Sequence, residues 1–154
     1  MNATPYNFQY SLGYLAVVSA RLFAANTNRQ LAAAGLELTA EQWAMLQILL
    51  NEDGRSQEEL LGFTRYEKSS LSRLLDGLEK KELIRREKSP TDGRRKNVFI
   101  TEKGAEQGRT GTRLALEMLQ SLYKDIDAKD LDTCRSVLAR IQGGLLRVLR
   151  AEEI

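Results

Sequence analysis

The spacing of apolar side chains along the chain predicts a mostly helical protein. Residues 7–34 place an apolar side chain at every third or fourth position, which is the spacing of one face of a helix, and Gly35 follows as a stop. Two more long helices are expected, at about 102–126 and at about 129–151. The last helix is apolar over an unusually wide arc, formed by Leu131, Cys134, Leu138, Ile141, Leu145 and Val148, with Val137, Leu146 and Leu149 beside them.

Three shorter helices are expected between the long ones, because three segments have the form of a capping box. In this motif a Ser or Thr hydroxyl and a Glu or Gln side chain three residues later serve free backbone N–H groups. The segments begin at Thr39, Ser56 and Thr64. They predict a helix that ends near Asn51, a short helix after Ser56, and a helix that starts between Arg65 and Lys68 and buries Leu71, Leu74, Leu75 and Leu78.

The period then changes from helical to extended. Residues 83–88 and 97–100 are rich in strand formers, and turn residues lie between them, so a β-hairpin with a long tip is predicted. Thr101 can cap the helix that follows, although Gly104, Gly108 and Gly111 are poor helix formers in its first turns. The expected fold class is mainly α with a small β-hairpin (α+β), in a single domain over residues 1–154.

Positive charge gathers in the middle of the chain. Residues 65–96 hold eleven Lys or Arg and six Asp or Glu, a net charge of +5 in a protein whose whole-chain charge is +2. A positive face releases counterions when it meets phosphates, which favours a polyanionic partner. A charge run alone can also be an ordinary solvated face.

Composition narrows the function classes. The chain has one cysteine, Cys134, and no histidine, which excludes an internal disulfide, a cysteine zinc site and imidazole catalysis. It has no Gly-rich phosphate loop or paired-acid motif, so we expect no enzyme, no cofactor and no metal. The N-terminus has no basic region or long apolar run, and we therefore expect a cytoplasmic protein without a membrane partner. Cys134 is expected in the core, and thiol-based peroxide sensing is not expected.

The order of the predicted elements is that of a winged helix-turn-helix. The second helix of such a unit fits the major groove of DNA, about 12 Å wide, and its N-terminal side chains reach base edges. Ser69, Ser70 and Ser72 permit a close approach, and Arg65, Lys68 and Arg73 can meet phosphates or guanine edges. The hairpin tip, Lys88 to Lys96, would enter the neighbouring minor groove.

The residues of this segment resemble the multiple-antibiotic-resistance regulator (MarR) family. The matching residues are SLSRLLDGLE at 70–79, Leu83-Ile84, Arg86, Asp92-Gly93-Arg94 and Ile100-Thr-Glu-Lys-Gly104. The long first helix, Trp43 in the second helix and the two long C-terminal helices extend the resemblance over essentially the whole chain. The chain departs from the family at Glu82, where the family usually has Gly, and at Ile100, where it usually has Leu.

The resemblance implies a homodimer with dimerisation helices at 7–34 and 105–151 and a winged helix-turn-helix lobe at 39–101. Two such lobes would bind a pseudopalindromic operator in double-stranded DNA, and the protein would be a repressor that a small aromatic or lipophilic effector releases. The wide apolar arc of the last helix independently calls for a partner, and close helix approach there would offset the cost of Gly143 and Gly144, roughly 1 kcal/mol each. The alternative function is a winged-helix dimer that acts through protein contacts or binds DNA with little sequence preference.

Two sets of candidate site residues follow. Asp92 is expected to orient Arg86 or Arg94, and its plain alternative is a turn residue; these two roles are compatible. Tyr10, Tyr14 and Trp43 are candidates for an effector pocket, and their alternative role is dimer core. The DNA-binding candidates are Arg65, Lys68, Ser69, Ser70, Ser72, Arg73, Lys88, Asp92, Arg94, Arg95 and Lys96.

Overall fold

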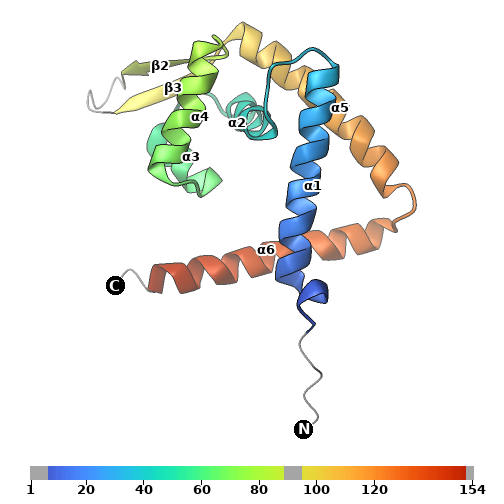
Figure 1. The fold of residues 1–154 in the computed structure, drawn as a ribbon. Helices are drawn as coiled ribbons and strands as arrows, with labels where there is room; N and C mark the ends of the chain where they lie inside the picture. The colour runs from blue at the N-terminus through green and yellow to red at the C-terminus, as the bar shows by residue number, and fades with distance from the viewer. Residues whose placement is uncertain (1–6, 89–94, 152–154) are drawn as a thin grey trace. The chain divides into compact units, whose positions relative to one another are not determined.

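A computed structural model describes residues 7–88 and 95–151 and confirms the predicted fold class (Figure 1). The chain divides into two compact units, Met1–Ala115 and Leu116–Ile154, with the boundary inside α5. The elements are a 3₁₀ turn η1 (Phe8–Tyr10), α1 (Leu12–Ala33), α2 (Ala40–Asn51), β1 (Arg55–Ser56), α3 (Gln57–Thr64), α4 (Lys68–Lys80), β2 (Ile84–Lys88), β3 (Lys96–Ile100), α5 (Glu102–Tyr123) and α6 (Ala128–Ala151).

The first long helix starts later than its apolar spacing predicted. The hydroxyl of Ser11 accepts a hydrogen bond from the backbone N–H of Tyr14 at 3.2 Å and caps α1, so residues 8–10 form a separate 3₁₀ turn. The predicted start at residue 7 is therefore wrong. The regular spacing of apolar residues continues on both sides of Ser11, so the spacing alone does not show where the helix begins. The predicted stop is confirmed, since Gly35 adopts a left-handed φ of +74° just after the helix.

Two of the three predicted capping boxes are confirmed. Thr39 with Gln42 and Ser56 with Glu59 make both reciprocal bonds. Thr64 is not a cap: its hydroxyl donates to the carbonyl of Leu60 at 2.8 Å in the last turn of α3, and α4 begins after Glu67 without a side-chain cap. The sequence shows that a hydroxyl precedes an acidic residue by three positions. It does not show whether that hydroxyl lies in the last turn of one helix or at the start of the next.

The first unit holds the buried core. Leu71, Leu75 and Leu78 form the buried stripe of α4, and Leu74 is only partly buried. The remaining buried residues come from the end of α1, from α2, α3 and the sheet, and from the connections before α2 and before β2: Leu31, Leu38, Met45, Leu46, Leu49, Leu60, Leu83, Ile84 and Val98. Because α4 is anchored on one side by leucines, its polar side is left for a partner.

The sheet has three antiparallel strands in the order β1-β3-β2. The β2–β3 hairpin was predicted from the sequence, and β1 was not. Strand β1 pairs Arg55 with Val98 and Ser56 with Asn97. A strand of two residues is too short to show an alternating pattern of apolar and polar residues in the sequence.

The glycines at the start of α5 are helical and buried. An added Cβ on Gly104 would lie 2.0 Å from the carbonyl oxygen of Leu83, and one on Gly111 would lie 2.4 Å from Cδ1 of Trp43. These glycines therefore let α5 approach the lobe closely, which offsets their low helix propensity. The helix ends at Tyr123, three residues before the predicted end.

The second unit contains the end of α5 and α6. A carboxylate oxygen of Asp127 accepts the N–H of Lys129 at 2.7 Å, and the helix runs without interruption through Gly143 and Gly144. Several large apolar side chains of α6 are exposed: Leu138, Ile141, Leu145, Val148 and Leu149. None of the helices in the described part of the chain has a stretch long and apolar enough to cross a membrane.

Candidate nucleic-acid interface

The polar side of α4 is the first part of the candidate interface. Lys68, Ser69, Ser72 and Arg73 are exposed, and the side chain of Arg73 lies along the helix, with Nε 3.4 Å from the carbonyl oxygen of Ser69. Ser70 is half-buried, so among the predicted serines Ser69 and Ser72 are better placed to touch a partner. This arrangement presents small hydroxyls and a guanidinium on the side opposite the leucine stripe.

Arg65 lies in the turn between α3 and α4. It is exposed and has a left-handed φ of +57°, which ends α3. A turn residue in this conformation is normally Gly, Asn or Asp, so Arg65 is kept here at a conformational cost. A cation at the turn of a helix-turn-helix unit is suited to a backbone phosphate.

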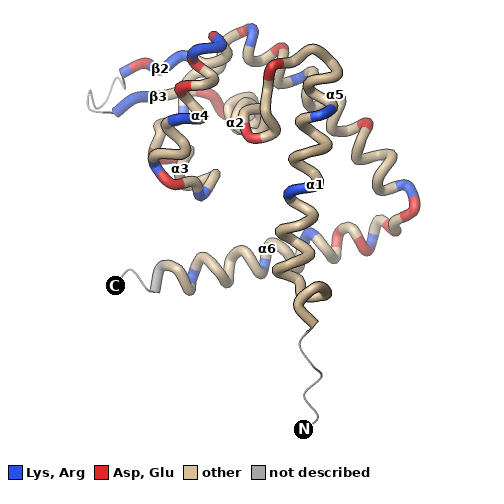
Figure 2. Tube along the Cα trace, viewed as in Figure 1, with Lys and Arg blue, Asp and Glu red and all other residues tan. Residues whose placement is uncertain are grey.

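The β2–β3 ribbon is the second part of the interface. Its register places Ile84 opposite Ile100, Arg86 opposite Val98, and Lys88 opposite Lys96. Side chains alternate along a strand, so these three pairs share one face of the ribbon. That face changes from buried apolar residues to two exposed lysines toward the tip, and Figure 2 shows Lys and Arg gathered on the ribbon while α1 is mostly uncharged.

Arg86 ties the ribbon to α4. Its Nη2 donates to Oδ1 of Asp76 at 2.6 Å, its Nε donates to Oε2 of Glu79 at 3.0 Å, and its backbone N–H donates to Oε1 of Glu79 at 3.1 Å. The hydrogen bond from the Arg86 side chain holds the pKa of Glu79 below its ordinary value, and the Glu79 carboxylate raises the pKa of Arg86. The Arg86 side chain is only 15% exposed, so it positions the ribbon and is not available for DNA.

These two carboxylate partners were not predicted. We expected Asp92 to orient Arg86 or Arg94, and the described partners of Arg86 are Asp76 and Glu79. The sequence did contain a signal for these partners. Asp76 and Glu79 are three residues apart on a helix, so both carboxylates lie on one face, and the strand that carries Arg86 follows that helix. Asp92 and Arg94 lie outside the described residues, so their predicted roles stay predictions.

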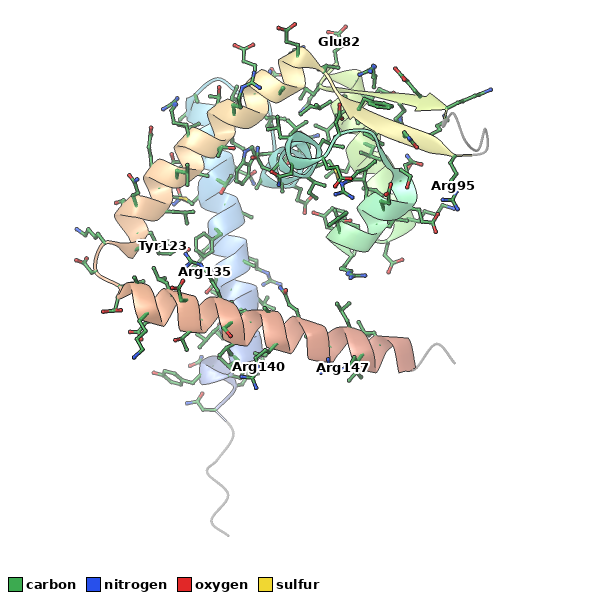
Figure 3. The ribbon with its side chains drawn as sticks, turned by 180° about the vertical axis from the view of Figure 1, so that it is seen from behind. Glu82, Arg95, Tyr123, Arg135, Arg140 and Arg147 are labelled. Carbon is green, nitrogen blue, oxygen red and sulfur yellow. The ribbon has the colours of Figure 1, made fainter. Side chains whose placement is uncertain are left out.

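The described end of the wing adds three cations. Lys88, Arg95 and Lys96 are exposed, as expected for DNA-binding residues. Arg95 lies where β3 begins (Figure 3). Its Nη1 is 3.2 Å from Oε2 of Glu58, in the first turn of α3. Glu58 could not be predicted as a partner of Arg95, because the two residues are far apart along the chain.

The aromatic candidates for an effector pocket fall into separate contacts. The indole N–H of Trp43 donates to the carbonyl of Gly108 at 3.3 Å, beneath α5. The Tyr14 ring lies 4.9 Å from the ring of Phe8, and Tyr10 is 78% exposed. A shared pocket for Tyr10, Tyr14 and Trp43 therefore stays a prediction.

Part of the chain matches a known protein family. Residues 35–95 match the model of the MarR family. Over 69 residues the chain is 36% identical to the putative transcriptional regulatory protein for the hcr operon of Thauera aromatica, covering 45% of this chain and 42% of that protein. Over 68 residues it is 32% identical to the transcriptional regulator HosA of Escherichia coli O111:H-, covering 44% and 50%. The aligned part thus spans about half the length of these curated relatives.

Solved structures extend the likeness to nearly the whole chain. A crystal structure of MarR is 25% identical and superposes with a TM-score of 0.77, covering 97% of this chain and 99% of that one. The fold is shared with MepR of S. aureus in a DNA complex (TM-score 0.78, 23% identity, 90% and 99% covered). It is also shared with BpsR of Bordetella bronchiseptica, whose DNA binding is regulated by 6-hydroxynicotinic acid (TM-score 0.80, 19% identity, 90% and 98% covered). Together with the Arg86-anchored wing and the exposed face of α4, these matches support a winged-helix protein of the MarR family.

Proposed function

We propose that the protein is a transcriptional regulator that binds duplex DNA in a sequence-specific manner through α4 and the β2–β3 ribbon. The observation that carries this proposal is the continuity between two exposed polar surfaces. The Arg86 network fixes the ribbon to α4, and the ribbon face that bears Lys88 and Lys96 is the face that bears Arg86. The curated relatives are transcriptional regulators, and MepR has been crystallised with DNA, which supports the same role here.

The division of labour follows from the chemistry of each part. The exposed Ser69, Ser72 and Arg73 of α4 would meet base edges in the major groove. Arg65 and Lys68 at the turn would contact phosphates, which fix the register of the protein on the duplex. The wing, with Lys88, Arg95 and Lys96 and with the predicted Asp92 and Arg94, would lie along the minor groove.

We propose that the active form is a homodimer. The exposed apolar residues of α6, with the exposed Leu12, Leu15 and Leu22 of α1, would be covered by a second copy. The helices at 7–34 and 105–151 would form the dimer, and the lobes at 39–101 would bind half-sites of a pseudopalindrome about 34 Å apart.

The proposed mode of regulation is repression that a small aromatic or lipophilic acid relieves. BpsR has its DNA binding regulated by 6-hydroxynicotinic acid, an aromatic acid. In this chain the acid would bind near Tyr10, Tyr14 and Trp43 and favour a lobe spacing that does not match the groove repeat.

The test is selection from a randomised duplex library, followed by competition between the selected duplex and random duplex. The proposal expects a preference of about a thousandfold or more for the selected sequence. Equal affinity for both duplexes would contradict sequence-specific regulation. That result would favour the alternative of low-specificity DNA binding.

A further inference from the structure

A groove of about 430 Å³ lies between the first turn of α3, the exposed face of α4 and the ribbon. Side chains from all three elements bring hydrogen-bond donors to it, including the hydroxyl of Ser72 and the ammonium of Lys96. The start of α3 adds the positive end of a helix dipole. A groove of this composition is suited to an anion. Its lining residues are Ser56, Gln57, Glu58, Ser72, Arg86, Arg95 and Lys96.

Among the described residues that line the groove, Glu58 is the only acidic one, and it already forms an ion pair there. Its carboxylate lies 3.2 Å from Nη1 of Arg95, and the two side chains are 73% and 57% exposed. An ion pair this exposed contributes only about 0–1 kcal/mol to stability, so stability alone gives little reason for it. The larger effect of Glu58 is electrostatic. Its carboxylate places a negative charge in a groove whose cations would otherwise attract an anionic ligand.

We propose that Glu58 is an intramolecular competitor of DNA at this groove. In the free protein the Glu58 carboxylate pairs with Arg95. When DNA binds, a phosphodiester of its backbone replaces that carboxylate beside Arg95. This inference rests on the proposed DNA-binding function. Since the exchange involves a phosphate and no base, Glu58 weakens binding to every sequence alike and keeps the affinity for non-specific DNA low.

The matched control for Glu58 is Glu87. Its carboxylate also pairs with an arginine in this lobe, 2.7 Å from Nε of Arg85, and it too is exposed. The register places Glu87 opposite Asn97, on the ribbon face away from Lys88 and Lys96. Glu87→Gln therefore removes the same charge without clearing the groove.

The experiment measures binding of a labelled duplex of random sequence, about 30 base pairs long, against salt concentration. Glu58→Gln should tighten binding by about three- to tenfold near 0.1 M salt and steepen the salt slope by about one unit. Glu87→Gln should change affinity by less than about twofold. Unfolding curves accompany these measurements, and Glu58→Gln should leave stability within about 1 kcal/mol of the original protein.

Dependence on Arg95 completes the test. In an Arg95→Gln background the gain from Glu58→Gln should shrink to that of Glu87→Gln, because the exchange has lost its cation. If the original protein binds duplex but Glu58→Gln and Glu87→Gln behave alike, the inference fails and the proposed function stands. An undiminished gain without Arg95 would likewise overturn it. If the original protein binds no duplex, the proposed function fails first and the inference falls with it.

Discussion

Lys88 and Lys96 stand directly opposite each other in the antiparallel register of β2 and β3. Like charges at opposed positions of a hairpin are destabilising. Both side chains are exposed, on the ribbon face that continues from Arg86. We interpret the pair as a site whose repulsion is relieved when DNA phosphates lie along the wing.

Replacing Lys96 should therefore change the stability of the fold and the affinity for DNA in opposite directions. Lys96→Gln is expected to raise the free energy of unfolding by a few tenths of a kcal/mol, because one of two opposed charges is removed. It should also weaken binding to all duplexes and lower the salt slope by about one unit. Denaturant unfolding and anisotropy titrations at several salt concentrations measure the two effects. Lys124→Gln, in the second unit, has the same charge change and should leave the salt slope as it is.

The exposed apolar face of α6 leads to a prediction about assembly. Leu145→Glu places a charge in the middle of that face, where the leucine is 59% exposed in the single chain. The substitution should dissociate the proposed homodimer, since a charge buried in an apolar interface costs several kcal/mol. Sedimentation at micromolar concentration measures the mass, with Glu106→Gln as an exposed control on α5. A Leu145→Glu protein that remains a folded dimer would contradict the assignment of this face.

Glu82 occupies a position that suits glycine. It follows the last residues of α4 with a left-handed φ of +60°, and the N–H of Leu83 donates to the carbonyl of Leu78 at 3.0 Å, as in a Schellman motif. Glu82→Gly should raise the free energy of unfolding by about 1 kcal/mol, because the strain of a side chain at this φ disappears.

Glu82→Gln is the matched control for that measurement. It keeps the strained conformation and loses only the exposed ion pair with Lys103, 3.6 Å away, so it should be neutral or slightly destabilising. Denaturant midpoints of the two variants give the comparison. Equal midpoints would mean that the left-handed turn carries no strain.

Glu79 should make the stability of the lobe sensitive to acid. Its folded-state pKa is lowered, chiefly by the hydrogen bond from Arg86, so it stabilises the fold at pH values above the ordinary carboxyl pKa. That stability is lost as the pH falls through the lowered value. At pH 7 Glu79→Gln should cost about 1 kcal/mol, a modest figure because the Glu79 side chain is 39% exposed.

The pH dependence is the decisive part of this prediction. The stability difference between the original protein and Glu79→Gln should shrink as the pH falls below about 4 and through the lowered pKa of Glu79, where both side chains become uncharged. Asp76→Asn is the control, because it removes the more exposed of the two Arg86 partners, at 57%. A difference that is independent of pH would show that the Arg86–Glu79 bond does not depend on the carboxylate charge.

Much of this architecture was predictable because local chemistry determines it. The Thr39 and Ser56 caps, the leucine stripe of α4 and the change of period at Lys81 each depend on residues close together in sequence. The features that sequence reasoning missed depend on distant contacts. Strand β1 forms only because β3 offers an edge, and Glu58 meets Arg95 only after the wing folds back beside α3. The serines of α4 were identified as a group, and only the packing of the helix separates half-buried Ser70 from exposed Ser69 and Ser72.

The central claim is that α4 reads bases while the wing holds phosphates. It is tested most directly by the affinity of Arg73→Ala and Lys96→Gln dimers for a selected operator and for each of its single-base variants. Arg73→Ala should flatten the preference at particular half-site positions, by about 1–3 kcal/mol for a lost bidentate contact. Lys96→Gln should lower every affinity by the same factor and leave the preferences unchanged. A Lys96→Gln dimer with altered preferences, together with an Arg73→Ala dimer with intact ones, would contradict the account.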